Sequence, residues 1–244
     1  FYAFYKNNYI KLVTFFIMIS GFGTYLEQNM TITQIQGSII LAILCIITLS
    51  NETKGIIKVS ELLVPILIIS IIIVGIQSLN YINISNITKY IIKTNQTNWI
   101  ISSILYASYN TILLIPTLIS IKKILDKKAI GKISITVTII IIILAISIYI
   151  SMIKIDVNIN NLEMPVTYII SHQFPHLKII YGIVILASIL TTAISLGSGL
   201  LQNITKEKKI KKTILVIICI ISIPVSQIGF SNLIGYLYPI FGYL

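Results

Sequence analysis

Apolar residues run along this chain in long stretches that short polar segments separate. The stretches lack the polar alternation that a membrane β-barrel needs, and most are long enough to cross about 30 Å of hydrocarbon as an α-helix. We therefore predict an all-α membrane protein, a polytopic helical bundle, with a further short helix within residues 162–171 across its outer face. The eight predicted spans, the second short and the last cut off, are residues 10–28, 35–50, 56–79, 98–121, 131–153, 177–201, 213–229 and 232–244.

Composition agrees with a membrane protein. Of the 244 residues, 56% are hydrophobic and 10% are charged, and the mean hydropathy is +0.97. A soluble domain carries about 25% charged residues, so this chain has too little charge to cover a surface that faces water. We expect its apolar side chains to face lipid or other helices, with the bilayer as a constant partner.

The net charge of +11 comes from lysine alone, because all 18 basic residues are lysines. Nucleic-acid binding is not expected, since these lysines lie between apolar stretches and there is no arginine for bidentate contacts. Fourteen lysines fall in alternate loops and four in the others. By the positive-inside rule the first set is cytoplasmic. This alternation supports the span count and predicts a multi-pass membrane protein.

Few residues inside the spans could carry out covalent chemistry. Glu61 lies near the cytoplasmic end of the third span, where it reads as an interfacial residue paired with Lys58. His172 and His176 have a spacing that suits a metal, but Pro175 separates them and no third ligand is near. Because no catalytic set lies within the membrane, we do not expect an enzyme, and no cofactor is implied.

The fourth span carries a small, polar and aromatic segment, followed by Pro116. Two interpretations are open from these residues alone. In one, the segment unwinds and its backbone lines a cavity. In the other, the helix continues and its hydroxyls bond neighbouring helices. The first makes these residues solute ligands: Tyr106, Ala107, Ser108, Tyr109 and Asn110.

The sixth span carries hydroxyls at helical spacing: Ser188, Thr191, Thr192 and Ser195. Hydroxyl oxygens suit a hard cation such as Na⁺ when backbone carbonyls complete the shell. The same residues, with Gly197 and Gly199, also suit close packing of helices. Without further context the packing interpretation is favoured.

Three segments resemble YkvI-type bacterial membrane proteins: Gly21–Glu27, Glu163–Pro165, and the closing run from Ser226 to Tyr243. The similarity extends, with gaps, over essentially the whole chain. These proteins are similar to the amino-acid/polyamine/organocation superfamily, which has a LeuT-type inverted-repeat fold. The resemblance implies a multi-pass protein of a bacterial plasma membrane. It also implies a single transmembrane domain, 1–244, that is a fragment covering helices three to ten of ten. Residues 1–80 would belong to the first repeat and 98–244 to the second.

The resemblance changes both assessments above. The fourth span becomes the broken sixth helix of that fold, so Tyr106–Asn110 would line the substrate site. The sixth span becomes helix eight, where an adjacent hydroxyl pair binds sodium in Na⁺-coupled members, and Thr191 and Thr192 match that pair. Proton-coupled relatives can place a lysine near this position, and its absence from mid-membrane here favours sodium.

These observations predict a secondary transporter. A cation gradient, carried by Na⁺, would drive uptake of an amino acid or related small solute by alternating access. The alternative is a receptor of the same fold, similar to spore-germination subunits, that binds a solute without moving it. A third hypothesis, a structural subunit of a larger complex, predicts no solute binding. The substrate and the oligomeric state do not follow from the sequence.

Overall fold

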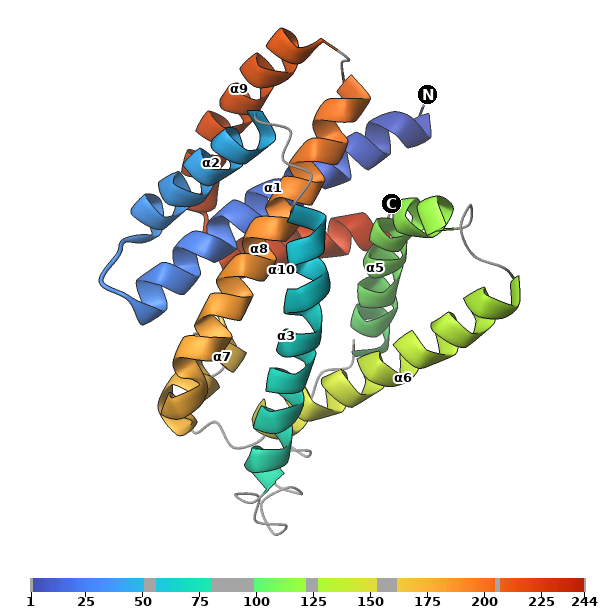
Figure 1. The fold of residues 1–244 in the computed structure, drawn as a ribbon, viewed down its shortest axis with the longest axis vertical. Helices are drawn as coiled ribbons and strands as arrows, with labels where there is room; N and C mark the ends of the chain where they lie inside the picture. The colour runs from blue at the N-terminus through green and yellow to red at the C-terminus, as the bar shows by residue number, and fades with distance from the viewer. Residues whose placement is uncertain are drawn as a thin grey trace. The chain divides into compact units, whose positions relative to one another are not determined.

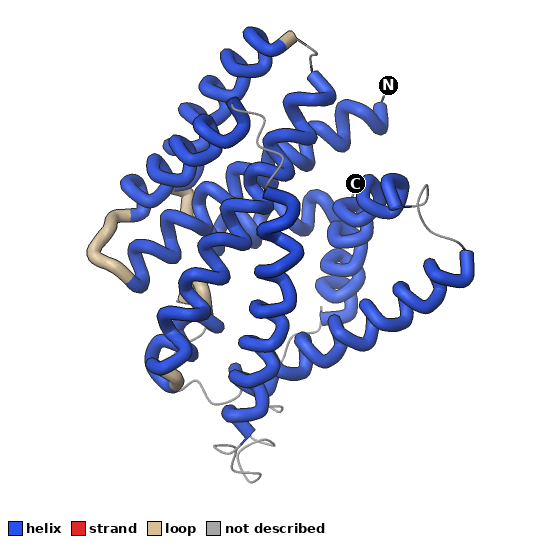
Figure 2. Tube along the Cα trace, in the orientation of Figure 1, coloured by secondary structure: helices blue, strands red, loops and turns tan. Residues whose placement is uncertain are grey.

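The computed structural model describes residues 2–50, 56–79, 99–121, 127–152, 162–204 and 207–243. Within these ranges every regular element is an α-helix (Figures 1 and 2). The all-helical prediction is confirmed, and α7 confirms the short helix expected within residues 162–171. The helices are α1 (Tyr2–Asn29), α2 (Gln34–Ser50), α3 (Ile56–Leu79), α5 (Trp99–Ile121), α6 (Lys127–Met152), α7 (Pro165–Gln173), α8 (Pro175–Ile204), α9 (Lys208–Ser226) and α10 (Phe230–Tyr243).

Several of these helices can cross a membrane. Within the described part of the chain, three are long and apolar enough on their own: Asn8–Asn29 of α1, Ala129–Met152 of α6 and Pro175–Ile204 of α8. Helices α9 and α10 qualify together as a fourth, with a bend of 109° between them. Shorter apolar helices cover Gln34–Ser50 and Leu63–Leu79. The total of eight spans and the inverted repeat stay predictions.

The chain divides into two compact units. Unit 1 contains residues 1–67 and 160–235, and unit 2 contains residues 68–159 and 236–244. Helices α1, α2, α7, α8 and α9 therefore belong to unit 1, and α5 and α6 belong to unit 2. Helices α3 and α10 each begin in unit 1 and end in unit 2. This division differs from the predicted repeats, 1–80 and 98–244, which stay a prediction.

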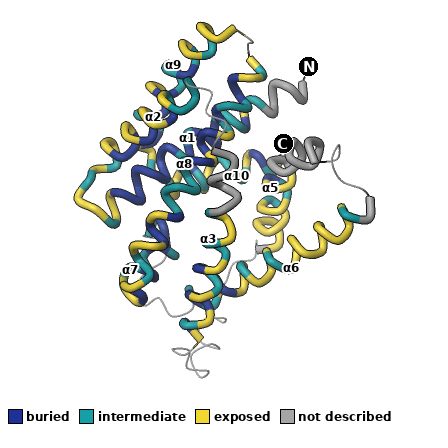
Figure 3. Tube along the Cα trace, in the orientation of Figure 1, coloured by how far each residue is buried: buried dark blue, intermediate teal, exposed yellow. Residues whose placement is uncertain are grey.

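Helix α1 is the central helix of unit 1. It contacts α2, α8 and α9, and most of its described side chains are buried (Figure 3). A helix that is apolar on all sides is expected in such a position. Glycine permits the closest approach, because a Cβ atom on Gly37 of α2 would lie 2.7 Å from the Cα of Gly23. The Gly21-Phe22-Gly23 segment of α1 is therefore a site of close helix packing.

Unit 2 contrasts with unit 1 in its exposure. Helix α6 has a mean hydropathy of 2.8, yet most of its described side chains are exposed and few are buried (Figure 3). Such a surface is unfavourable in water, and isoleucines such as Ile135, Ile139 and Ile141 suit contact with lipid. Helix α6 also packs on α3, where a Cβ on Gly75 would lie 2.6 Å from the Cβ of Ser147.

Candidate functional site

The predicted solute-binding segment lies in an unbroken helix. Helix α5 runs continuously from Trp99 to Ile121, so the unwinding expected at Tyr106–Asn110 is wrong for this structure. Its polar side chains bond the helix itself. The Ser108 hydroxyl donates to the carbonyl of Ile104 at 2.8 Å, and the Asn110 amide donates to the carbonyl of Tyr106 at 2.8 Å. These bonds satisfy the polar groups without any break in the backbone.

The same segment takes part in an aromatic cluster within unit 2. Tyr109 is buried and stacks on Tyr238 of α10, with ring centroids 4.2 Å apart, and Tyr106 meets Tyr109 edge-on at 5.3 Å. The Tyr106 side chain is 64% exposed, and Ala107 and Asn110 are also exposed. Tyr109 is therefore a packing residue, while Tyr106 and Asn110 remain accessible to a ligand.

The predicted cation ligands on α8 are only partly brought together. The hydroxyls of Thr191 and Thr192 both donate to the carbonyl of Ser188, at 3.0 and 2.8 Å. The Ser188 hydroxyl oxygen is buried and has no hydrogen-bond partner in the described part of the chain. Three hydroxyl oxygens thus lie within one turn, with lone pairs that can accept a cation. Ser195, one turn further, is exposed and adds no bond to this group among the described residues.

The two threonines differ in burial, which bears on both interpretations. Thr191 is 8% exposed in unit 1, whereas Thr192 is exposed. Nearby, a Cβ on Gly197 would lie 2.8 Å from Leu49 of α2, so this end of α8 also serves close packing. The hydroxyl oxygens of this helix therefore suit Na⁺ as ligands, whereas Gly197 serves helix packing.

A feature that the sequence did not single out as a site lies between α9 and α10. Helix α9 ends at Ser226, and Gly229 adopts a φ of +95°, in the left-handed region that favours glycine. Helix α10 then begins at Phe230 with a bend of 109°. We call residues 226–230 the α9–α10 break. The sequence predicted a boundary between two spans near this point, but not its partners.

The carbonyl of Ser226 is the centre of a buried polar network at this break. It accepts hydrogen bonds from the Ser20 hydroxyl of α1 at 3.0 Å and from the Gln34 amide of α2 at 2.8 Å. Gln34 also reaches the Thr24 hydroxyl at 3.4 Å. Ser20 and Ser226 are fully buried, so water cannot reach their polar groups. These hydrogen bonds therefore supply the partners that the buried groups need.

The start of α10 is held by a carboxylate from a distant part of the chain. Glu163, just before α7, accepts a hydrogen bond from the Ser231 backbone N–H at 2.6 Å. The first N–H groups of a helix have no partner within the helix, and negative charge is favourable there. A Cβ on Gly229 would lie 3.1 Å from the other Glu163 oxygen, so the glycine also makes room for this carboxylate.

Three sequence segments that carried the family resemblance meet at the α9–α10 break. Ser20 and Gly21 of α1 contact Ser226 and Phe230, and Glu163 contacts Ser231. A Cβ on Gly21 would lie 2.8 Å from the Phe230 ring. The three segments therefore belong to one structural feature of the fold.

Comparison with known proteins supports a membrane protein and goes no further. Over 229 residues the chain is 26% identical to an uncharacterized membrane protein, YkvI, of Bacillus subtilis (strain 168). The match covers 93% of this chain and 66% of YkvI, so the chain spans about two thirds of the length of that relative. No known family profile matches the chain. No solved structure matches it either. This protein is a helical membrane protein similar to YkvI.

Proposed function

We propose that this protein is a secondary transporter that takes up an amino acid or related amine by alternating access, coupled to Na⁺. The observation that carries the proposal is the division into two compact units that continuous helices connect. Alternating access requires parts of a protein to move as rigid bodies about flexible connections. Helices α3 and α10 are the described connections, since each begins in one unit and ends in the other.

Both connecting helices carry a proline close to the unit boundary. Pro65 lies in α3, where the boundary falls between Leu67 and Ile68. Pro239 lies in α10, and its missing N–H removes the helical partner of the carbonyl of Gly235, the last residue of unit 1. Proline weakens a helix locally and allows it to bend. These positions support the hypothesis that the two units move as bodies.

The packing of unit 1 agrees with an inverted repeat. If each repeat has five helices and α1 is the third of ten, then α1 corresponds to α8 and α2 corresponds to α9. Both of these pairs contact each other within unit 1. Contact between equivalent helices is expected close to a pseudo-two-fold axis.

The proposed roles follow the chemistry of the accessible groups. The hydroxyls of Ser188, Thr191 and Thr192 would bind the cation through their lone pairs. Tyr106, Ser108 and Asn110 would contact the solute, by side chains that now project from a continuous helix. Ala107 would border the same surface, and Tyr109 would support it through its stack on Tyr238.

Uptake by the purified protein in proteoliposomes tests the proposal. Uptake of a labelled amino-acid mixture would be measured with an inward Na⁺ gradient and with K⁺ in place of Na⁺. We expect Na⁺-driven uptake by the wild type. In the double variant Thr191→Ala/Thr192→Ala, the rate of this uptake should fall by about tenfold or more, because two cation ligands are removed. Thr213→Ala is the matched control, since Thr213 is an exposed hydroxyl on α9 that bonds its own helix at the Lys209 carbonyl.

Three outcomes would contradict parts of the proposal. Equal uptake in both salts would remove the sodium coupling. If the double variant keeps Na⁺-driven uptake, the cation does not bind at Thr191 and Thr192. Solute binding without uptake in either salt would replace the transporter by the receptor alternative.

A further inference from the structure

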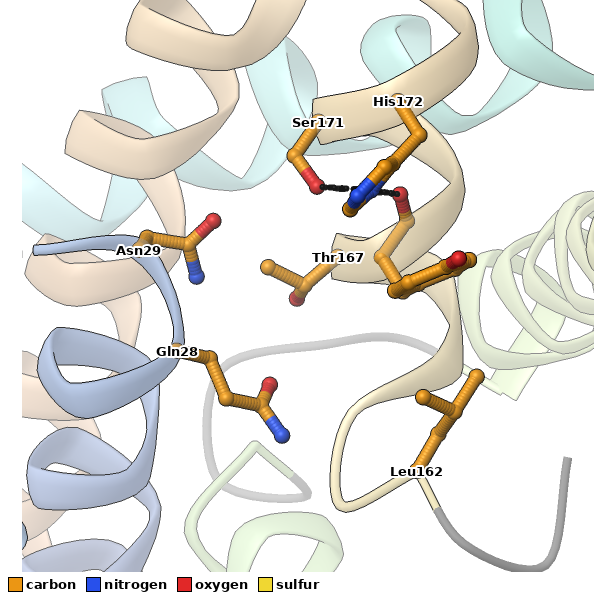
Figure 4. Close-up of a pocket in the computed structure, with 7 residues that line it drawn as sticks. Gln28, Asn29, Leu162, Thr167, Ser171 and His172 are labelled. Carbon is orange, nitrogen blue, oxygen red and sulfur yellow. Dashed lines mark hydrogen bonds between the residues drawn. The ribbon is translucent and has the colours of Figure 1, made fainter. Parts of the chain in front are cut away.

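A small cup with several polar side chains in its lining lies within unit 1, where α1 ends and α7 begins. It has a volume of about 230 Å³. Figure 4 shows Gln28 and Asn29, from the end of α1, facing Thr167 and Ser171 of α7. The lining is completed by Leu162, Tyr168 and His172. The lysine distribution predicts that both segments lie on the outer side of the membrane.

The hydrogen bonds of the cup determine which of its atoms are left for a ligand. The Asn29 amide group donates to the carbonyl of Tyr25 at 3.0 Å, so the Asn29 Oδ1 atom remains as an acceptor. The Ser171 hydroxyl donates to the carbonyl of Tyr168 at 3.0 Å, and its oxygen lies 3.0 Å from Nδ1 of His172, so its proton is committed and one lone pair remains for a ligand.

His172 contributes an acceptor for the same reason. Its Nδ1 atom lies 3.0 Å from the carbonyl of Tyr168 and 3.0 Å from the Ser171 hydroxyl oxygen, and the tautomer that serves both contacts is the one with the proton on Nδ1. In the neutral imidazole Nε2 is then a bare acceptor. The ring stacks on Tyr168 with centroids 4.0 Å apart, which restricts its orientation. Three of the polar side chains of the cup therefore present lone pairs, and none of its seven residues is a lysine.

We propose that this cup binds the primary ammonium group of a small solute. A group with several N–H donors and a positive charge matches a set of acceptors that has no cation of its own. A carboxylate would instead meet lone pairs. A volume of about 230 Å³ suits a solute of the size of a small amine or amino acid. That the cup recognises transported solutes on the outer side rests on the proposed transport function. That the cup binds an ammonium group does not depend on it.

Ligand-detected NMR on the purified protein in detergent tests this proposal with three probes of equal chain length: n-butylammonium, n-butanol and butyrate. We expect saturation transfer to n-butylammonium alone. His172→Phe keeps an aromatic ring on Tyr168 but removes the acceptor, and it should weaken n-butylammonium binding by about tenfold or more. His176→Phe makes the same change on α8 outside the cup and should bind as the wild type does.

A second variant gives a change in the opposite direction. Gln28 is exposed at the rim, and Gln28→Glu adds a negative charge without altering side-chain length. We expect it to strengthen n-butylammonium binding by about threefold at low salt and to lose this gain at high salt. This variant remains informative if His172→Phe fails to fold.

Either of two results would overturn the cup: binding of n-butanol or butyrate as strong as that of n-butylammonium, or unchanged n-butylammonium binding in both His172→Phe and Gln28→Glu. The two proposals also fail separately. A protein that binds n-butylammonium but takes up no solute contradicts the transporter. Solute uptake without n-butylammonium binding contradicts the cup.

Discussion

Tyr106–Asn110 of α5 and residues 226–230 between α9 and α10 are both polar interruptions of apolar stretches, but only the second interrupts its helix. In α5 the polar side chains form hydrogen bonds to their own helix, as the Asn110 amide does to the carbonyl of Tyr106. At the α9–α10 break, groups from α1, α2 and the segment before α7 bond the freed backbone.

The difference teaches that polar residues alone do not break a membrane helix. A break frees backbone N–H and C=O groups, and inside a membrane each must find a partner. Ser226 and Ser231 find such partners in distant segments, and Gly229 supplies a conformation that other residues disfavour. Tyr106–Asn110 has neither a glycine nor such partners among the described contacts, so its backbone keeps the helical bonds.

The largest expected effect comes from the backbone at the break. Gly229→Ala should lower the free energy of unfolding by about 1–3 kcal/mol, because it forces a side chain into the left-handed region and crowds the Glu163 carboxylate. The measurement is the unfolding transition of the purified protein in detergent. Gly235→Ala, within α10, is the control: its Cβ would meet nothing within 4 Å, and alanine is the better helix former. Equal destabilisation by the two variants would contradict the special role of Gly229.

A smaller effect is expected from the carboxylate at the start of α10. Glu163→Ala should cost about 1 kcal/mol, since it removes a charged acceptor from the Ser231 N–H. Glu163→Gln should cost less, because an amide oxygen can still accept this bond. The same unfolding measurement applies, with Glu27→Gln at the exposed end of α1 as a control that should change nothing measurable. If the alanine variant unfolds as the wild type does, the Glu163 contact does not hold α10.

The smallest effect on stability is expected in α5, where one substitution should change solute uptake without changing the free energy of unfolding. Asn110→Leu removes a bond that an exposed side chain makes to its own helix, so the free energy of unfolding should change by less than about 0.5 kcal/mol. If Asn110 contacts the solute, uptake should nevertheless fall by about tenfold or more. Thr138→Val removes a comparable bond in α6, to the carbonyl of Ser134, and should leave both quantities unchanged. Full uptake by a stable Asn110→Leu protein would remove this residue from the solute site.

Local patterns predicted the helices well, because helical hydrogen bonds and apolar side chains are properties of each segment. The bounds of α2, α3 and α5 lie within about one residue of the predicted stretches. The hydroxyls of α8 could also be identified from spacing alone. Their separation into a buried Thr191 and an exposed Thr192 could not, since it depends on which face of α8 meets α1 and α2.

The sequence by itself determined that this protein is helical and belongs in a bilayer, because those properties follow from the length, hydropathy and low charge of each stretch. Only the tertiary structure decided where a helix breaks and which polar atoms lie together for a ligand. The carbonyl of Ser226 accepts hydrogen bonds from Ser20, which is 206 residues away in the sequence, and from Gln34, which is 192 residues away. The acceptors of the cup lie in one place because α1 and α7 come together. Such partners are set by folding in three dimensions, and no local pattern along the chain contains them.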